Sequence, residues 1–109
     1  MKPVLFLGDS RAKLRLFPEG ARGDAGYQLG RVQRGLDPHD WKPMNSIGPG
    51  VREIRVRDSA GAFRVVYVAN FVEAVYVLHA FQKKSRQTSR HDLAVAELRF
   101  RELKRSATQ

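Results

Sequence analysis

Apolar residues in the first third of the chain fall into short blocks separated by polar segments. Residues 4–7 form an apolar run closed by Gly8-Asp9-Ser10, which predicts a strand followed by the start of a helix. Residues 9–17 have helical spacing, and Pro18 then predicts a break and the first turn of a second helix. That helix is expected over residues 19–33, with an apolar stripe formed by Ala25, Leu29, Val32 and Leu36.

The middle of the chain changes from a loop pattern to a strand pattern. Residues 36–50 are rich in proline and glycine, so we expect a long loop there, held to the core by Trp41. Residues 51–58 then alternate, which predicts a strand with one buried and one solvent-exposed face. Ile54 and Val56 form the apolar side of this alternation. The side expected to face solvent consists of Glu53, Arg55 and Arg57.

Two more strands and a helix follow. Residues 59–61 predict a hairpin turn, and residues 63–69 are apolar on both faces apart from Arg64, which is typical of a central strand. Residues 74–81 predict another apolar strand. Thr88 or Ser89 is expected to cap the next helix, and Ser89 and Asp92 have the spacing of a capping box. The helix that they begin carries an apolar stripe of Leu93, Ala96, Phe100 and Leu103, and a frayed tail is expected from residue 106 to residue 109.

The order of these elements predicts one domain spanning residues 1–109. Its fold class is α+β, a small twisted antiparallel sheet with the N-terminal helices and the C-terminal helix packed on it. We expect all the helices on one face of this sheet and the other face to be open.

The chain is strongly basic, and this charge is informative about its binding partner. Twenty Lys and Arg residues oppose eleven Asp and Glu residues, which gives a net charge of +9 and a pI of about 10.7. Such self-repulsion is tolerated most readily when an anionic partner neutralises it, and nucleic acid is the leading candidate. Charge alone does not separate nucleic acid from an anionic membrane or an acidic protein.

Several kinds of chemistry are excluded by what the sequence lacks. It has no cysteine, no glycine-rich phosphate loop and no histidine pair at metal-binding spacing, so no metal and no cofactor is expected. The first apolar run is too short for a signal peptide or a membrane span, which predicts a cytoplasmic protein without a membrane partner. The three histidines are scattered and more typical of structural roles. His91 is favoured slightly over His39 and His79.

Three short sequence motifs suggest a family. They are Glu-Ile-Arg at 53–55, Phe-Arg-Val-Val-Tyr at 63–67 and Leu-His-Ala-Phe-Gln-Lys-Lys-Ser at 78–85. In this order, and followed by a helix, they make residues 4–103 resemble the phage-derived, HigB-like branch of the RelE/ParE toxin superfamily. The resemblance implies a RelE-like fold and a type II toxin that cuts mRNA on the ribosome. It also implies a cognate helix-turn-helix antitoxin that keeps the toxin inactive.

In that family the RNA's own 2′-hydroxyl is the nucleophile, no metal is needed, and basic residues hold the phosphate and assist proton transfer. Carried over to this chain, the resemblance makes Arg64 the first choice for phosphate contact and matches Lys83 and Lys84 to the family's paired lysines. No tyrosine stands in the C-terminal segment as a general acid, so that role stays open, with His91 and Arg90 as weak candidates. The expected RNA-binding residues are Lys42, Arg55, Arg57, Arg86 and Arg90.

Simpler interpretations stay open at this stage. Arg55 and Arg57 could be a solvated strand face, and Arg55 could form a salt bridge with Glu53 or another acid. Arg64, in an otherwise apolar strand, needs either an ionic partner or a function. For the whole chain, the alternatives are a ParE-like inhibitor of another target such as gyrase, which arrests growth without cutting mRNA, and a nucleic-acid-binding regulator without catalytic activity.

Overall fold

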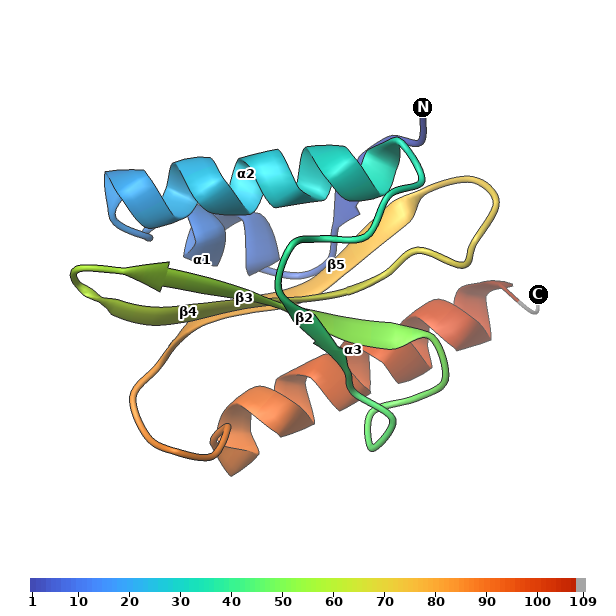
Figure 1. The fold of residues 1–109 in the computed structure, drawn as a ribbon. Coiled ribbons are helices and arrows are strands. Elements are labelled where there is room, and N and C mark those ends of the chain that lie inside the picture. The colour runs from blue at the N-terminus through green and yellow to red at the C-terminus, as the bar shows by residue number, and fades with distance from the viewer. Residues whose placement is uncertain (108–109) are drawn as a thin grey trace.

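The computed structural model describes residues 1–107 and contains one five-stranded sheet and three helices (Figure 1). The sheet has the strand order β1-β5-β4-β3-β2, with β1 parallel to β5 and every other neighbouring pair antiparallel. In chain order the elements are β1 (Val4–Phe6), α1 (Ser10–Arg15), α2 (Glu19–Gln33), β2 (Trp41–Pro43), β3 (Val51–Asp58), β4 (Gly61–Val68), β5 (Val75–Lys83) and α3 (Arg90–Ala107).

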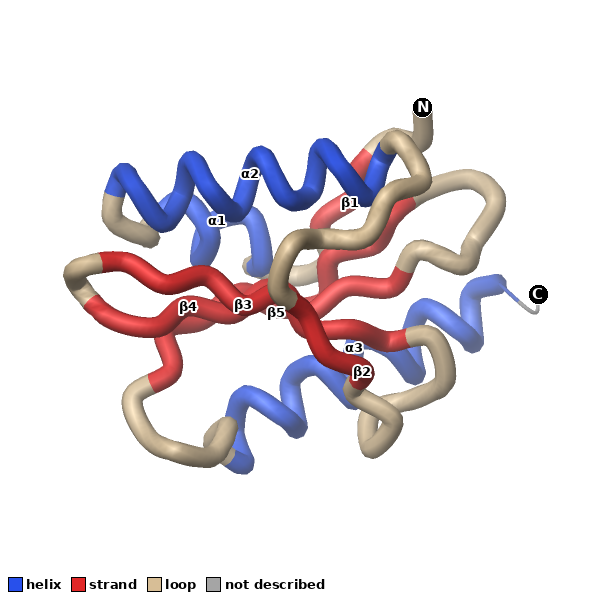
Figure 2. Tube along the Cα trace, in the orientation of Figure 1, coloured by secondary structure: helices blue, strands red, loops and turns tan. Residues whose placement is uncertain are grey.

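The sheet lies between two helical layers, with α1 and α2 on one face and α3 on the other (Figure 2). The α+β class is therefore confirmed, whereas the expectation that all helices share one face is wrong. The reason lies in β4, whose side chains are buried on both sides. Phe63 and Val65 pack in the core with α1 and α2, while Val66 and Val68 pack in the core with α3. Each face therefore needs its own cover.

The expected loop at residues 36–50 contains a short edge strand, β2, which pairs with β3. Lys42 of β2 lies opposite Glu53, and Trp41 lies opposite Ile54. Trp41 is only half-buried, and the Arg52 guanidinium lies 4.0 Å from the centre of its ring. The tryptophan thus anchors an edge strand through a cation–π contact rather than a loop through the core.

Local features of β5 and α3 fix how the last helix docks. The register between β4 and β5 shifts after Val66, so Leu78 has no directly paired residue. The predicted helix cap is confirmed, because the Asp92 amide donates to Ser89 Oγ at 3.1 Å. The helix continues through residues 106 and 107, which were expected to fray. The other two residues of the expected tail, 108 and 109, lie outside the described residues.

Candidate functional site

The register of the sheet brings cationic side chains from four strands onto one face. Directly paired residues in neighbouring strands point to the same side of a sheet. Arg64 pairs with Arg55, and Val66 pairs with Glu53, so these residues share the face on which Val66 packs toward α3. The cations that share this face, called the basic cluster below, are Lys42, Arg55, Arg57, Arg64 and Lys83.

An open groove of about 420 Å³ lies beside this cluster. One wall is β2 and the turn after it, which contribute Lys42 and Met44. The other wall is the end of β5 and the loop that leads to α3, which contribute Lys83 and Arg86, and Leu93 of α3 also lines the groove. Both walls of the groove therefore carry basic side chains, and Arg86, one of the expected RNA-binding residues, lines one of them.

Glu53 is the largest departure from the sequence-based expectation. It was placed on the solvent-exposed face of its strand, but its exposed fraction is 0%. Its Oε1 atom lies 3.3 Å from Arg64 Nε and 4.0 Å from Lys42 Nζ. Arg64, itself 7% exposed, thus has the ionic partner that a charge in a central strand requires. The salt bridges of Glu53 are to Lys42 and Arg64, whereas the alternative considered from the sequence was Arg55.

The electrostatics of the cluster favour proton transfer at Lys83. Partial burial lowers the pKa of Lys83, and the positive charges of Arg64, Lys42 and Arg55 lower it further, while Glu53 opposes the shift. An amine whose pKa is lowered releases its proton more readily near neutral pH. Burial, together with Arg55, also lowers the pKa of Arg64. A guanidinium nevertheless keeps its charge in proteins, so Arg64 is suited to hold a phosphate.

Three other candidates lie elsewhere. Lys84 and His91 line a second groove, of about 680 Å³, which also includes residues of α1 such as Lys13. Phe17 and Phe63 contribute apolar side chains to it. Arg90 is exposed at the first position of α3 and lines neither groove. The structure therefore separates Lys84 and His91 from the basic cluster.

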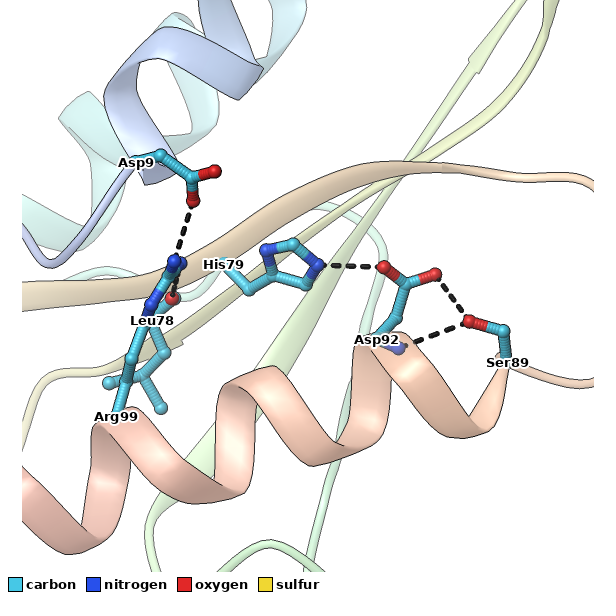
Figure 3. A network of polar contacts seen from close by, with 6 residues as sticks. All are labelled: Asp9, Leu78, His79, Ser89, Asp92 and Arg99. Atoms are coloured by element: carbon cyan, nitrogen blue, oxygen red, sulfur yellow. Dashed lines mark hydrogen bonds and ion pairs between the residues drawn. The ribbon is translucent and has the colours of Figure 1, made fainter.

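A polar network that the sequence did not reveal lies beside the second groove (Figure 3). His79 is buried on β5, and its Nε2 atom lies 2.7 Å from Asp92 Oδ1. The Ser89 hydroxyl donates to the other oxygen of Asp92 at 2.7 Å. Burial lowers the pKa of His79, although Asp92 opposes this shift. The helix-capping aspartate therefore also ties the start of α3 to the sheet.

The same network fixes the middle of α3. Arg99 Nη1 donates to the Leu78 carbonyl at 2.9 Å, where the sheet register is interrupted. Arg99 Nη2 donates to Asp9 Oδ1 at 2.6 Å, just before α1 (Figure 3). The only sequence signals for these contacts are a histidine within an apolar strand and an arginine on a helix. Neither signal identifies its partner.

Comparison with known families adds an independent finding. The sequence signature described as "Phage derived protein Gp49-like (DUF891)" matches residues 12–101, which is most of the chain. The chain belongs to this family. The Gp49-like family is a RelE/ParE-like family of toxins from toxin–antitoxin systems, so membership implies an antitoxin partner. A search of curated proteins found no match for this Gp49-like chain.

Two further observations concern residues 1–107 of the Gp49-like chain. No group of three or more His, Asp or Glu side chains in this range is placed to hold a metal ion. No helix in the same range combines the length and the apolar character needed to cross a membrane.

Proposed function

We propose that this Gp49-like chain is a HigB-like toxin that cuts mRNA on the ribosome and thereby blocks translation. One observation carries the proposal. Cations from β2, β3, β4 and β5 converge on one sheet face beside an open groove. A purely solvated strand face would carry exposed arginines, whereas Arg64 in the middle of this face is only 7% exposed. A phosphate backbone is the ligand that such a cluster fits best.

The proposed reaction is a transfer within the RNA. The 2′-oxygen attacks the adjacent phosphorus, the bond between phosphorus and the 5′-oxygen breaks, and a 2′,3′-cyclic phosphate remains. Arg64 and Arg55 bind the non-bridging oxygens and stabilise the charge that develops there. Lys83, with its lowered pKa, accepts the proton of the 2′-hydroxyl. Lys42, on the facing wall of the groove, donates the proton that the departing 5′-oxygen takes up.

The partner proposed for the free toxin is a helix-turn-helix antitoxin. Such a partner would have to neutralise part of the net charge of +9. An acidic segment of the antitoxin lying on the basic cluster would neutralise part of this charge and block access of RNA to the groove. The basic cluster is therefore proposed as a binding surface that RNA and antitoxin share.

The test is brief expression in a bacterium, with growth followed and new mRNA 5′ ends mapped. Lys83→Ala is the informative variant and Lys84→Ala is its matched control, because these neighbours carry the same charge but line different grooves. We expect cuts confined to translated frames for the wild type and for Lys84→Ala, and their loss for Lys83→Ala.

Each other outcome has a definite meaning. Growth arrest without new 5′ ends contradicts the nuclease proposal and favours a ParE-like inhibitor of a target such as gyrase. RNA binding without arrest or cuts favours a non-catalytic regulator. Equal cutting by all three proteins removes Lys83 from the proposed mechanism.

A further inference from the structure

A fully buried carboxylate lies under the basic cluster. Glu53 has an exposed fraction of 0%, and neither of its oxygens accepts a hydrogen bond from residues 1–107. Arg64 Nε lies 3.3 Å from Oε1 but is not aligned for a hydrogen bond, so the contact is an ion pair only. Burying a carboxylate that accepts no hydrogen bond opposes folding, and replacing both members of a buried ion pair by apolar side chains of similar volume often leaves stability unchanged or raises it. Stability therefore gives no sufficient reason for Glu53.

The side chain that Glu53 restrains is Arg64. The guanidinium of Arg64 is held at two nitrogens, because Nε faces Glu53 and Nη1 donates to the Phe63 carbonyl at 3.0 Å. Neither contact uses the third nitrogen, Nη2. A guanidinium whose plane is fixed in advance loses less conformational freedom when it binds a phosphate than a mobile one does.

Glu53 also offsets repulsion among the cations around it. Arg55 and Arg64 lie directly opposite each other on β3 and β4, an arrangement that like charges disfavour. Lys42 approaches Glu53 from β2, at 4.0 Å from the oxygen that faces Arg64. The negative charge of Glu53 thus lies among positive charges from three strands, on the face where RNA is proposed to bind.

From these contacts we infer that Glu53 is a positioning residue of the site, which holds Arg64 in the orientation needed for phosphate and sets the electrostatic balance of the basic cluster. The inference rests on the proposed function, since the phosphate belongs to the RNA substrate. Glu53 acts only through its neighbours, because a side chain with no exposed surface cannot touch RNA in this conformation.

The test compares Glu53→Gln, which keeps the shape and removes the charge, with Glu102→Gln on the exposed surface of α3. For Glu53→Gln we expect a thermal midpoint below that of the wild type, because Arg64 loses its buried ionic partner, and cleavage of ribosome-bound mRNA slowed by at least tenfold at a temperature where the variant is folded. Glu102→Gln should match the wild type in both. Cleavage by Glu53→Gln within twofold of the wild-type rate overturns the inference.

The pH dependence of cleavage separates positioning from a merely structural role. The groups around Lys83 are Arg64 on β4, Arg55 and Glu53 on β3, and Lys42 on β2, and Glu53 alone among them raises the pKa of Lys83. Removing the charge of Glu53 should therefore move the pH–rate profile to lower pH. A slower variant whose pH–rate profile is not displaced assigns Glu53 a merely structural role and contradicts the inference.

An NMR measurement on the wild-type protein is independent of catalysis and of whether any variant folds. The Arg64 Nε–H proton should exchange with water more slowly than that of the exposed Arg57. Equal exchange rates overturn the inference whatever the cleavage assays give. If the wild type cuts no RNA while Arg64 Nε–H is protected, the proposed function fails but the Glu53–Arg64 contact stands. The two failures are therefore distinguishable.

Discussion

At the scale of single residues, Lys83 and Lys84, at and just after the end of the longest strand, have different surroundings. Lys83 is the last residue of β5 and pairs with Ala62, on the face of the basic cluster. Lys84 lines the second groove together with His91. The sequence presents the lysines as a pair, but side chains alternate along a strand, and the position where β5 ends decides which groove each one lines. The two lysines are therefore neighbours in the sequence but line different grooves.

His79 gives a prediction about pH. Burial lowers its pKa below the ordinary value of about 6.5, although Asp92 opposes the shift. The unfolded chain therefore binds a proton at higher pH than the folded chain, so stability from this group is complete above the ordinary pKa and is lost as pH falls toward the folded-state value. Urea denaturation from pH 7.5 to 5.5 should show the wild type losing stability faster than His79→Gln. His91→Gln, which alters an exposed histidine, should follow the wild type.

At the scale of elements, α3 depends on its cap as well as on its apolar stripe. Ser89 accepts from the Asp92 amide and donates to the Asp92 carboxylate, which in turn contacts His79. Ser89→Ala should therefore lower the free energy of unfolding by about 1 kcal/mol, as loss of a helix cap does. The measurement is the shift of the urea midpoint, and Thr88→Ala is the control. A Ser89→Ala midpoint equal to that of Thr88→Ala would show that the cap does not stabilise α3.

Two glycine substitutions are expected to change the stability of the fold in opposite directions. A Cβ at Gly48 would overlap the ring of Phe100, which belongs to the core between α3 and the sheet. Gly48→Ala should therefore destabilise the fold by about 1–3 kcal/mol. Gly26 lies inside α2 with open space around it, so Gly26→Ala should stabilise the fold by about 0.5–1 kcal/mol. Calorimetry checks both, and stabilisation by Gly48→Ala is incompatible with the described docking of α3.

The elements also show how far the sequence alone could lead. Periodicity and turn residues predicted α2, β3 and the cap of α3, because these depend on local patterns. The short strand β2 could not be predicted, since three residues including a proline carry no strand pattern and owe their pairing to β3. The burial of Glu53 was missed because alternation assigns a residue to a face but does not show what covers that face. The ionic neighbours of Glu53 on that face, Lys42 and Arg64, come from two other strands, which the alternation along one strand does not reveal.

At the scale of the whole molecule, the charge of the chain predicts binding that depends strongly on salt. Each phosphate contact with single-stranded RNA contributes about −0.7 to the slope of log affinity against log salt. Arg57→Gln should therefore make this slope shallower by about 0.7. Arg22→Gln, on the opposite helical layer, should leave it unchanged. Fluorescence anisotropy with a short RNA at several salt concentrations checks both values, and equal slopes for the two variants would argue against RNA binding at the basic cluster.

The central claim is that the basic cluster, and not the second groove, carries out RNA cleavage. The most direct measurement is the single-turnover rate at which purified protein cuts mRNA on programmed ribosomes without added metal beyond that which the ribosomes require. The account predicts at least a hundredfold loss for Lys83→Ala and Arg64→Ala, and rates within a fewfold of the wild type for Lys84→Ala and His91→Ala. Loss of cleavage in His91→Ala or Lys84→Ala, with Lys83→Ala active, would contradict it.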